Sequence, residues 1–195
     1  LHWMVHSFPT RRSSDLYDDI SIVPIRVAIL DVANDPGDEV SFATDVVSKR
    51  VVLAGHIVAE QISVAPDSVS IHRRTKIWMA NPDIDVIVTI GGAGMGPRDI
   101  TTDAMRELFS REFEAFGLVW HTLMFPEIGL ATLTTRVCAG IARGKIVYCL
   151  PDHVVACRTG WDRMIRWQLD NRHQPGSLVE LLPRFARPET RIECR

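Results

Sequence analysis

Short apolar runs alternate along the chain with longer segments in which apolar residues recur every three or four positions. The runs IRVAIL, HIVAEQISV, DVIVTI and KIVYCL occupy residues 25–30, 56–64, 85–90 and 145–150. Short runs rich in β-branched residues are typical of buried β-strands. The sequence therefore predicts four strands, and a polar or glycine-containing turn follows each of them.

The segments between these runs have helical spacing. Residues 41–54 place most of their apolar side chains on one side, and Gly55 is suited to end that helix. A second helix is expected over 68–80, before Asn81-Pro82. Three more are predicted: from Thr101 or Thr102 to Gly117, over 127–142, and after His153, where Trp161, Met164, Ile165 and Leu169 share one face.

Alternating strands and helices favour an α/β fold in which helices cover both faces of a parallel sheet. Three loops with unusual composition follow the carboxyl ends of predicted strands, at residues 31–39, 91–99 and 151–153. Ligands of such sheets bind beyond the carboxyl ends of the strands. We therefore expect the three loops to converge on one crevice.

The composition is that of an ordinary globular domain: 195 residues, 46% hydrophobic and 24% charged. The net charge of −2 gives no general attraction for nucleic acid or an anionic membrane. We find no run of about 18 apolar residues, so no membrane span is expected. The four cysteines show neither disulfide nor zinc spacing, which favours free thiols in a reducing cytoplasm.

Both ends of the chain differ from its centre. The stretch HSFPTRRSSDL at residues 6–16 resembles the translation of a sequencing-library adapter. We therefore expect residues 1–16 to be an artefactual or disordered leader, and residues 17–174 to form the domain. Residues 175–195 are expected to be an irregular tail or a short packed extension.

Gly91-Gly92-Ala93-Gly94 follows the clearest strand directly. Glycine allows backbone N–H groups to turn inward and approach an anion, because no Cβ blocks them. The spacing matches neither the dinucleotide fingerprint nor a P-loop. The loop therefore suits a phosphate or another anionic group; the alternative is a tight turn without a ligand.

Asp67 and Asp99 each precede a predicted helix. One interpretation is that they cap those helices or form Asx turns. The other is that one of them holds a magnesium ion, which takes carboxylates together with phosphate oxygens and water. Basic side chains that could neutralise phosphates, or otherwise lie exposed on the surface, are Arg98, Arg136 and Arg158. No order of residues supports covalent catalysis.

Three stretches together resemble the MoaB/MogA family, the molybdopterin adenylyltransferase fold of molybdenum cofactor biosynthesis. They are TIGGAGMGPRDITTDA, FPEIGLATLTTRVCAGIA and ACRTGWDRMIRWQLD, and the resemblance extends over about residues 24–170. The first stretch is similar to the family pattern T-G-G-T-G…R-D-x-T-x-D-A. The other two are closer to the MoaB branch than to the MogA branch.

The resemblance implies a Rossmann-like three-layer sandwich with a mostly parallel sheet, assembled as a cytoplasmic trimer or hexamer. The implied reaction joins molybdopterin to ATP with Mg²⁺ and gives molybdopterin-AMP and pyrophosphate. By resemblance, Asp99 and Asp67 are catalytic and metal-binding. The implied substrate and nucleotide contacts are Gly91, Gly92, Ala93, Gly94, Ser41, Pro151, Asp152 and His153.

The chain departs from the family pattern at several of these positions. The family's Pro-Gly-Ser after the last strand is Pro151-Asp152-His153 here, which adds a carboxylate where an anion should approach. Two unit charges about 5 Å apart repel by roughly 3 kcal/mol at an effective dielectric near 20. The remaining departures are Phe42, Ala93, Leu118 and His121, where the family has Gly, Thr, Glu and Arg.

These departures keep two further hypotheses open. One is a catalytically silent accessory protein that binds the pterin or the nucleotide. The other is an oligomeric scaffold that passes intermediates between enzymes of molybdenum cofactor synthesis.

Overall fold

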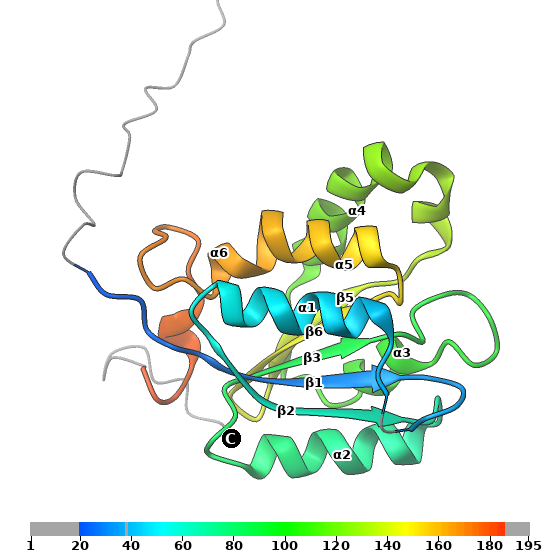
Figure 1. Cartoon of the computed structure of the whole chain (residues 1–195), viewed down its shortest axis with the longest axis horizontal. Coiled ribbons are helices and arrows are strands. Elements are labelled where there is room, and N and C mark those ends of the chain that lie inside the picture. The colour runs from blue at the N-terminus through cyan, green and yellow to red at the C-terminus, as the bar shows by residue number, and fades with distance from the viewer. Residues whose placement is uncertain (1–19, 38, 186–195) are drawn as a thin grey trace, which may run out of the picture.

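A six-stranded sheet forms the centre of the molecule (Figure 1). The computed structural model describes residues 20–37 and 39–185, so the leader expected at 1–16 lies outside the described residues. The strand order is β2-β1-β3-β6-β5-β4. The strands are β1 Arg26–Val32, β2 Ile57–Val64, β3 Val86–Ile90, β4 Arg111–Glu112, β5 Cys138–Ala142 and β6 Lys145–Leu150.

Four of the strands are parallel. β1 pairs in parallel with β2 and β3, and β3 pairs in parallel with β6. β5 is antiparallel to β6, and β4 is antiparallel to β5. The prediction of a mostly parallel sheet is confirmed, and the loops after β1, β3 and β6 leave from one edge of the sheet.

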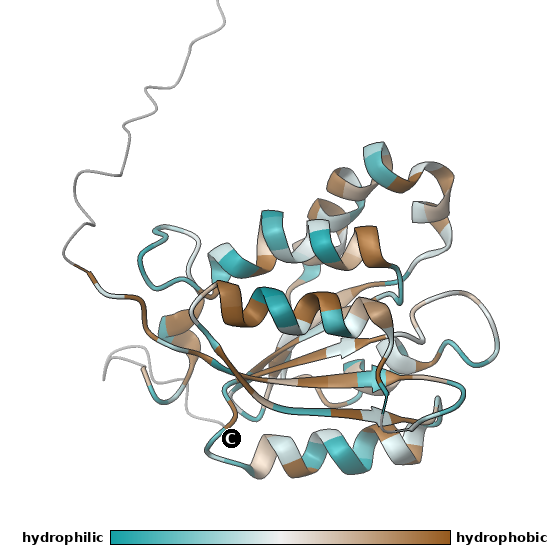
Figure 2. Cartoon of the chain, in the orientation of Figure 1, coloured by the Kyte–Doolittle hydropathy of each residue, from teal (hydrophilic) through white to brown (hydrophobic). Residues whose placement is uncertain are grey.

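Helices cover both faces of the sheet (Figure 1). One face carries α1 (Phe42–Leu53), α4 (Glu114–Ile128) and α5 (Val154–Gly160), and the other carries α2 (Ser68–Ala80) and α3 (Thr101–Arg106). Each face has its own core. The core under α1, α4 and α5 is centred on Trp120, Tyr148 and Trp161, and the core under α2 and α3 is centred on Ile71 and Trp78. Figure 2 shows the apolar strands between these layers. The three-layer sandwich is confirmed.

The helical region continues beyond α5 on the same face of the sheet. A π-helical segment, η3 (Trp161–Ile165), and a single turn, α6 (Arg166–Gln168), follow α5 directly. The predicted inward face is confirmed, because Trp161, Met164, Ile165 and Leu169 are all buried.

The helices predicted at 101–117 and 127–142 are wrong. α3 ends at Arg106, and the short strand β4 separates it from α4, which runs on to Ile128. The apolar residues predicted to share one helix are divided between the two cores. Leu108 and Phe109 pack on one face of the sheet, and Phe113 and Phe116 pack on the other. The second segment instead holds a 3₁₀ helix, η2 (Gly129–Thr134), followed by β5.

The end of the described chain packs against the domain. Residues 175–185 include a 3₁₀ turn, η4 (Val179–Leu181), whose Val179 is buried, as is Leu182. Arg184 Nη2 lies 2.6 Å from Oδ2 of the buried Asp85. This part of the predicted tail is therefore a packed extension. Within the described ranges the cysteines are free and buried, at Cys138, Cys149 and Cys157.

Among the described residues one stretch, Glu114–Thr134, is long and apolar enough to cross a membrane by length and composition, whereas the sequence predicts no membrane span. An 18-residue window within it has a mean hydropathy of 1.2, and 22% of that window is buried. The α-helix itself stops at Ile128, and Gly129 turns the chain with φ 58°. The 15 residues of α4 span about 22 Å, which is short of the roughly 30 Å of a bilayer core. Its inner side chains, Phe116, Trp120 and Met124, are buried in the protein core.

Candidate active site

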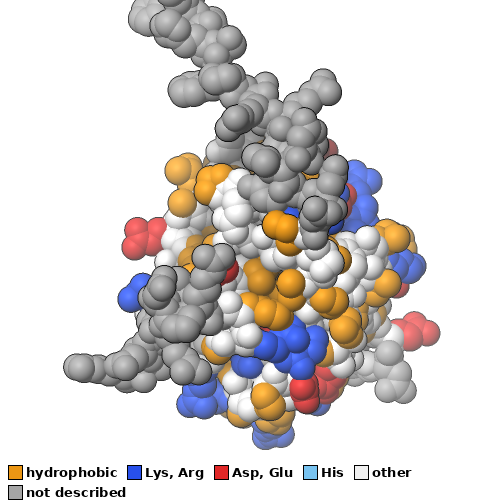
Figure 3. All heavy atoms as spheres, turned by 90° about the vertical axis from the view of Figure 1, so that its left-hand side faces the viewer, with side chains coloured by type: hydrophobic (Ala, Val, Ile, Leu, Met, Phe, Trp, Pro, Cys, Tyr) orange, Lys and Arg blue, Asp and Glu red, His pale blue; other side chains and the backbone are white. Residues whose placement is uncertain are grey.

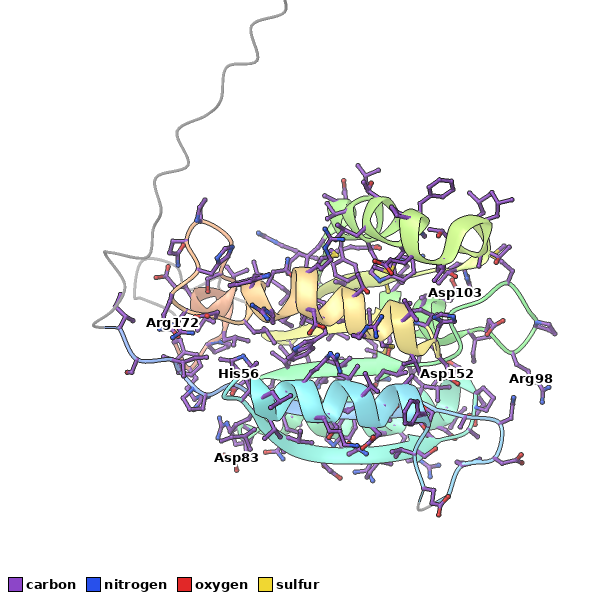
Figure 4. All side chains as sticks on the ribbon, turned by 45° about the horizontal axis from the view of Figure 1, so that its top comes forward. His56, Asp83, Arg98, Asp103, Asp152 and Arg172 are labelled. Atoms are coloured by element: carbon purple, nitrogen blue, oxygen red, sulfur yellow. The ribbon has the colours of Figure 1, made fainter. Side chains whose placement is uncertain are left out.

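The three loops predicted to converge do so. They form a cleft of about 460 Å³ at the carboxyl edge of the parallel strands. Asp152 and Arg98 lie at this end of the molecule in Figure 4. The cleft is lined by residues after β1 (Val32, Ala33, Asn34), β3 (Gly92, Gly96, Pro97, Arg98, Asp99) and β6 (Asp152), together with Pro66.

The first two glycines of the loop are required by close packing. Gly91 has φ 99°, and a Cβ at this position would lie 2.4 Å from the backbone oxygen of Val32. Gly92 has φ 61°, and a Cβ there would lie 2.2 Å from Oγ1 of Thr101. An L-residue with a side chain disfavours this backbone region as well. The loop can therefore turn back over β1 and α3 only with glycine at both positions.

Asp99 occupies the space left by the later glycines. Cβ atoms at Gly94 and Gly96 would lie 2.6 Å and 3.0 Å from its Oδ2. The Gly96 N–H donates a hydrogen bond to that oxygen, at 2.8 Å. The loop thus folds around the carboxylate of Asp99, which stands in the wall of the cleft.

Several successive N–H groups of the loop donate no hydrogen bond to the described residues. The Gly91 N–H donates to the Leu150 carbonyl at 3.0 Å. The N–H groups of Gly92, Ala93 and Gly94 have no hydrogen-bond partner within residues 20–37 and 39–185. Ala93 is only 3% exposed, and the buried Oγ1 of Thr101 beside the loop also lacks a partner among the described residues. Consecutive unpaired N–H groups form a concave site for an anion.

Arg136 fixes the shape of this loop. Its Nε donates to the Gly94 carbonyl at 2.9 Å, and Nη2 donates to the Asp99 carbonyl. Nη1 pairs with Asp103 of α3 at 2.8 Å. Of the three arginines considered as phosphate ligands, Arg136 is thus engaged with the loop itself, and Arg158 does not line the cleft. Arg98 does line it, and no hydrogen bond or ion pair engages Arg98 in the described part of the chain.

Asp31 is a site residue that the sequence did not single out. It is the penultimate residue of β1, is 2% exposed, and its Oδ1 accepts hydrogen bonds from Ser41 Oγ and Thr44 Oγ1, each at 2.7 Å. Its Oδ2 accepts from the Ser41 N–H at 3.0 Å. Ser41 also caps α1. The available indication is a carboxylate at the carboxyl end of a mostly apolar strand, although the sequence places Asp31 in the loop after that strand.

Asp152 brings a second carboxylate close to this network. Burial raises its pKa, and the negative charge of Asp31 raises it further, while a hydrogen bond from Ser41 lowers it. The carboxyl group therefore stays protonated to a higher pH than an exposed aspartate. Asp152 lines the same cleft as Asp99. When Asp152 is ionised, its negative charge therefore repels an anionic ligand in the cleft.

Asp67 and His153 serve as helix caps. The Asp67 carboxylate accepts a hydrogen bond from the Ser70 N–H at 2.8 Å. Hydrogen bonding from the Ser70 side chain, and then from this N–H, lowers the pKa of Asp67. Its neighbour Pro66 lines the cleft, whereas Asp67 does not. His153 Nδ1 accepts from the Ala156 N–H at 3.4 Å. Pro151 is buried, and its carbonyl accepts hydrogen bonds from the His153 N–H and from Cys157.

The other departures from the family pattern lie away from the cleft of the single chain. Phe42, at the start of α1, is 69% exposed, and Leu118, on α4, is 71% exposed. His121 is half-buried between α4 and η2, and burial lowers its pKa. None of the three lines the cleft.

Fold and site together define a Rossmann-like α/β protein with a polar cleft at the carboxyl edge of its parallel strands. The family model described as "Probable molybdopterin binding domain" matches residues 29–171. Molybdenum cofactor biosynthesis protein B of Escherichia coli K12 is 36% identical over 153 residues, which cover 78% of this chain and 90% of that protein. A crystal structure of molybdenum cofactor biosynthesis protein B aligns with a TM-score of 0.74 and 25% identity over 77% of this chain and 94% of the other.

A third relative has a more specific name. The probable molybdopterin adenylyltransferase of Methanocaldococcus jannaschii is 42% identical over 77 residues, or 40% of this chain and 47% of that protein. The chain belongs to the MoaB/MogA family of molybdenum cofactor biosynthesis proteins and, within it, to the MoaB branch.

Proposed function

We propose that this protein adenylylates molybdopterin with Mg-ATP, releasing pyrophosphate. The observation that carries the proposal is the row of unpaired N–H groups at Gly92, Ala93 and Gly94, beside the carboxylate of Asp99. Such a row suits a phosphate group, and the reaction joins two phosphates. The relative named a probable molybdopterin adenylyltransferase supports the same activity.

The chemistry explains why the site needs no nucleophilic side chain. The terminal phosphate of molybdopterin attacks the α-phosphorus of ATP, a new P–O bond forms, and the bond to the β-phosphate oxygen breaks. The attacking oxygen is already anionic at neutral pH, so the obstacle is repulsion between phosphates. Preorganised N–H donors oppose that repulsion, and Arg98 adds a positive charge at the cleft.

The residues present fit a magnesium ion of the kind that accompanies ATP. Magnesium usually takes one or two carboxylates, with phosphate oxygens and water completing its shell. Asp99 offers such a carboxylate in the cleft. The ion would neutralise charge on the phosphates. We assign no metal contact to Asp67, since it caps α2.

A direct assay tests the proposal. Purified protein is incubated with molybdopterin, ATP and Mg²⁺, and both pyrophosphate and molybdopterin-AMP are measured. Formation of both products in equal amounts, above a control without molybdopterin, is the expected result. Saturable binding of ATP or molybdopterin without either product would establish the accessory role instead. If neither ligand binds, the hypothesis of an oligomeric scaffold remains.

Asp152 is the residue that favours the silent, ligand-binding alternative. Removing its charge by Asp152→Asn should tighten ATP binding about tenfold, as expected for relief of roughly 1.4 kcal/mol of repulsion. In the wild type, the affinity should rise as the pH falls through the raised pKa of Asp152, because protonation removes the same charge. Calorimetric titration of both proteins between pH 5 and 8 measures this.

ATP also takes up protons in this pH range. Comparing the two proteins separates the effect of protonating Asp152 from the effect of protonating ATP. The variant should bind equally or more tightly at every pH, with an advantage that shrinks as the pH falls. An unchanged affinity at pH 8 would show that Asp152 does not repel the nucleotide.

We propose that the protein is a homo-oligomer, a trimer or hexamer, assembled through α4 and η2. The apolar side chains exposed there, which we call the α4 surface, are Leu118, Val119, Phe125, Leu130 and Leu133. Leu130 and Leu133 are 72% and 76% exposed. Contiguous exposed apolar side chains mark contact surfaces, and a second copy of the chain is the partner always present. Other enzymes of cofactor synthesis are further partners that this proposal includes.

The double variant Leu130→Glu/Leu133→Glu is therefore expected to be monomeric, because it places two charges in the contact. Size-exclusion chromatography with light scattering measures the mass. Ile77→Glu, on α2 and 54% exposed, is the matched control and should leave the mass unchanged. A wild type that is already monomeric at micromolar concentration contradicts the assembly. A cytoplasmic location, in keeping with the free thiols, is part of the same proposal.

A further inference from the structure

A second cavity, of about 480 Å³, lies at the amino ends of the parallel strands. His56, which directly precedes β2, and Arg172 lie at this end in Figure 4, away from Asp152 and Arg98. Figure 3 views the same end and shows apolar and basic side chains gathered there. Part of the wall is apolar, including Leu53 and Trp161. The volume is within the range of small-molecule sites.

His56 provides a buried hydrogen-bond donor in this wall. It is 5% exposed, and its Nδ1 accepts a hydrogen bond from the Ile25 N–H at 3.3 Å. The proton of the neutral ring is therefore on Nε2. Burial lowers the pKa of His56, which keeps the ring neutral at pH 7. Nε2 has no partner among the residues that the structure describes. A buried donor without a partner is costly unless a ligand supplies an acceptor.

The charges around the cavity leave one cation unpaired. Arg50 Nε lies 3.1 Å from an oxygen of Asp162, and Arg172 Nη2 lies 2.8 Å from Asp170. Arg166 has no carboxylate partner in the described part of the chain.

The orientation of Arg166 is set by an aromatic ring. Its guanidinium carbon stands 4.0 Å above the ring of Trp167, which holds the group by a cation–π contact and leaves its N–H edge free. The wall therefore carries one net positive charge and an oriented set of donors.

We propose that this cavity binds a monoanionic carboxylate carried on an apolar body. The carboxylate pairs with Arg166, and a small opening of the wall exposes the buried Nε2–H of His56 as a second hydrogen-bond donor to it. The apolar body packs against Leu53 and Trp161. One net charge matches a monoanion, whereas a phosphate monoester would bring a second negative charge with no partner. The site is separate from the cleft that holds Asp99, and the proposal does not depend on the adenylylation reaction.

Three small probes test the site on the full-length protein. ¹⁵N-labelled protein is titrated with benzoate, with the neutral isostere benzamide, and with phenyl phosphate, while the His56 Nε2 and Trp167 indole resonances are followed by NMR. Benzoate should give saturable shifts of both resonances, and benzamide should give none. No saturable shift with benzoate, or equal shifts with benzamide, would overturn the proposal; tighter binding of phenyl phosphate would overturn the assignment of a monoanion.

A variant locates the binding group. Arg166→Gln should weaken benzoate binding at least about tenfold, since it removes a charged hydrogen-bond donor. Arg166 is exposed, so the substitution leaves the core intact. The matched control is Arg163→Gln, also exposed and three residues earlier but outside the cavity wall, which should bind benzoate as the wild type does. Unchanged binding by Arg166→Gln would contradict the site.

Discussion

Replacing Gly92 with alanine is expected to reduce ATP binding by about a hundredfold. The new Cβ would lie 2.2 Å from Oγ1 of Thr101, which is fully buried, at a backbone angle of φ 61°. The loop must shift by roughly an ångström to relieve this contact, and misplacement of that size in a site costs about two orders of magnitude. The shift would displace the unpaired N–H groups of Gly92, Ala93 and Gly94 that are proposed to bind the phosphate. Isothermal titration calorimetry with Mg-ATP measures the loss.

Gly37→Ala provides the control. Gly37 lies in the loop after β1, which also contributes to the cleft, and apart from its chain neighbours no described atom lies within 4 Å of a Cβ built on it. This variant should bind ATP as tightly as the wild type. Thermal unfolding of both variants separates a local change of the loop from loss of the fold. Wild-type affinity in a folded Gly92→Ala protein would show that the loop does not hold the nucleotide.

Asp99→Asn is expected to lower the rate of pyrophosphate formation by about a hundredfold or more, with the fold preserved. In the wild type the Gly96 N–H donates to Oδ2 of Asp99 at 2.8 Å. Asparagine retains an oxygen that can accept this hydrogen bond, so the loop keeps its shape. The variant lacks the negative charge proposed to hold the metal beside the phosphates, and electrostatic groups of this kind contribute factors of that size. Steady-state assays across a range of Mg²⁺ concentrations measure both the rate and the metal dependence.

Asp67→Asn distinguishes the two aspartates. Asparagine caps a helix about as well as aspartate, so this variant should react within about twofold of the wild type. Equal losses in both variants would restore Asp67 to the metal site that the family resemblance implies. Full activity of Asp99→Asn would remove Asp99 from the mechanism.

The strands of the parallel sheet could be predicted because each is a short, buried apolar run. β3, VIVTI, is buried at every position. The helices capped by Ser41 and Asp67 were predictable for a similarly local reason, since a side-chain oxygen accepts the hydrogen bond of an N–H three residues later. Such contacts lie within a few residues of each other in the sequence.

β5 could not be predicted because its sequence, CAGIA, is short, apolar and free of charge, which suits a strand or a buried helix equally well. Its pairing with β6 decides the outcome. Arg143 and Gly144 both have positive φ, at 47° and 76°, as a two-residue hairpin turn requires. Gly140 completes the arrangement, because a Cβ there would lie 2.5 Å from the Arg111 carbonyl of β4. These contacts join residues distant in the sequence.

The candidate site was predictable in position but not in detail. The convergence of three loops follows from parallel topology alone. The contacts of Asp99 do not follow from topology, because the Gly96 N–H could equally have pointed toward a ligand. In the structure Gly94 and Gly96 leave room for the Asp99 carboxylate, and the Gly96 N–H donates to it. The N–H groups without a partner among the described residues include those of Gly92, Ala93 and Gly94. Asp31 was missed because its hydroxyl partners, Ser41 and Thr44, come from a helix rather than from its own loop.

The most direct test of the account is the response of three backbone amides to a phosphate ligand. A ¹⁵N-labelled sample is titrated with Mg-ATP, and the amide resonances of Gly92, Ala93 and Gly94 are followed by NMR. Large, saturable downfield shifts are expected at these three amides, with one dissociation constant and smaller changes elsewhere. Saturable binding that leaves these amides unmoved would contradict the account.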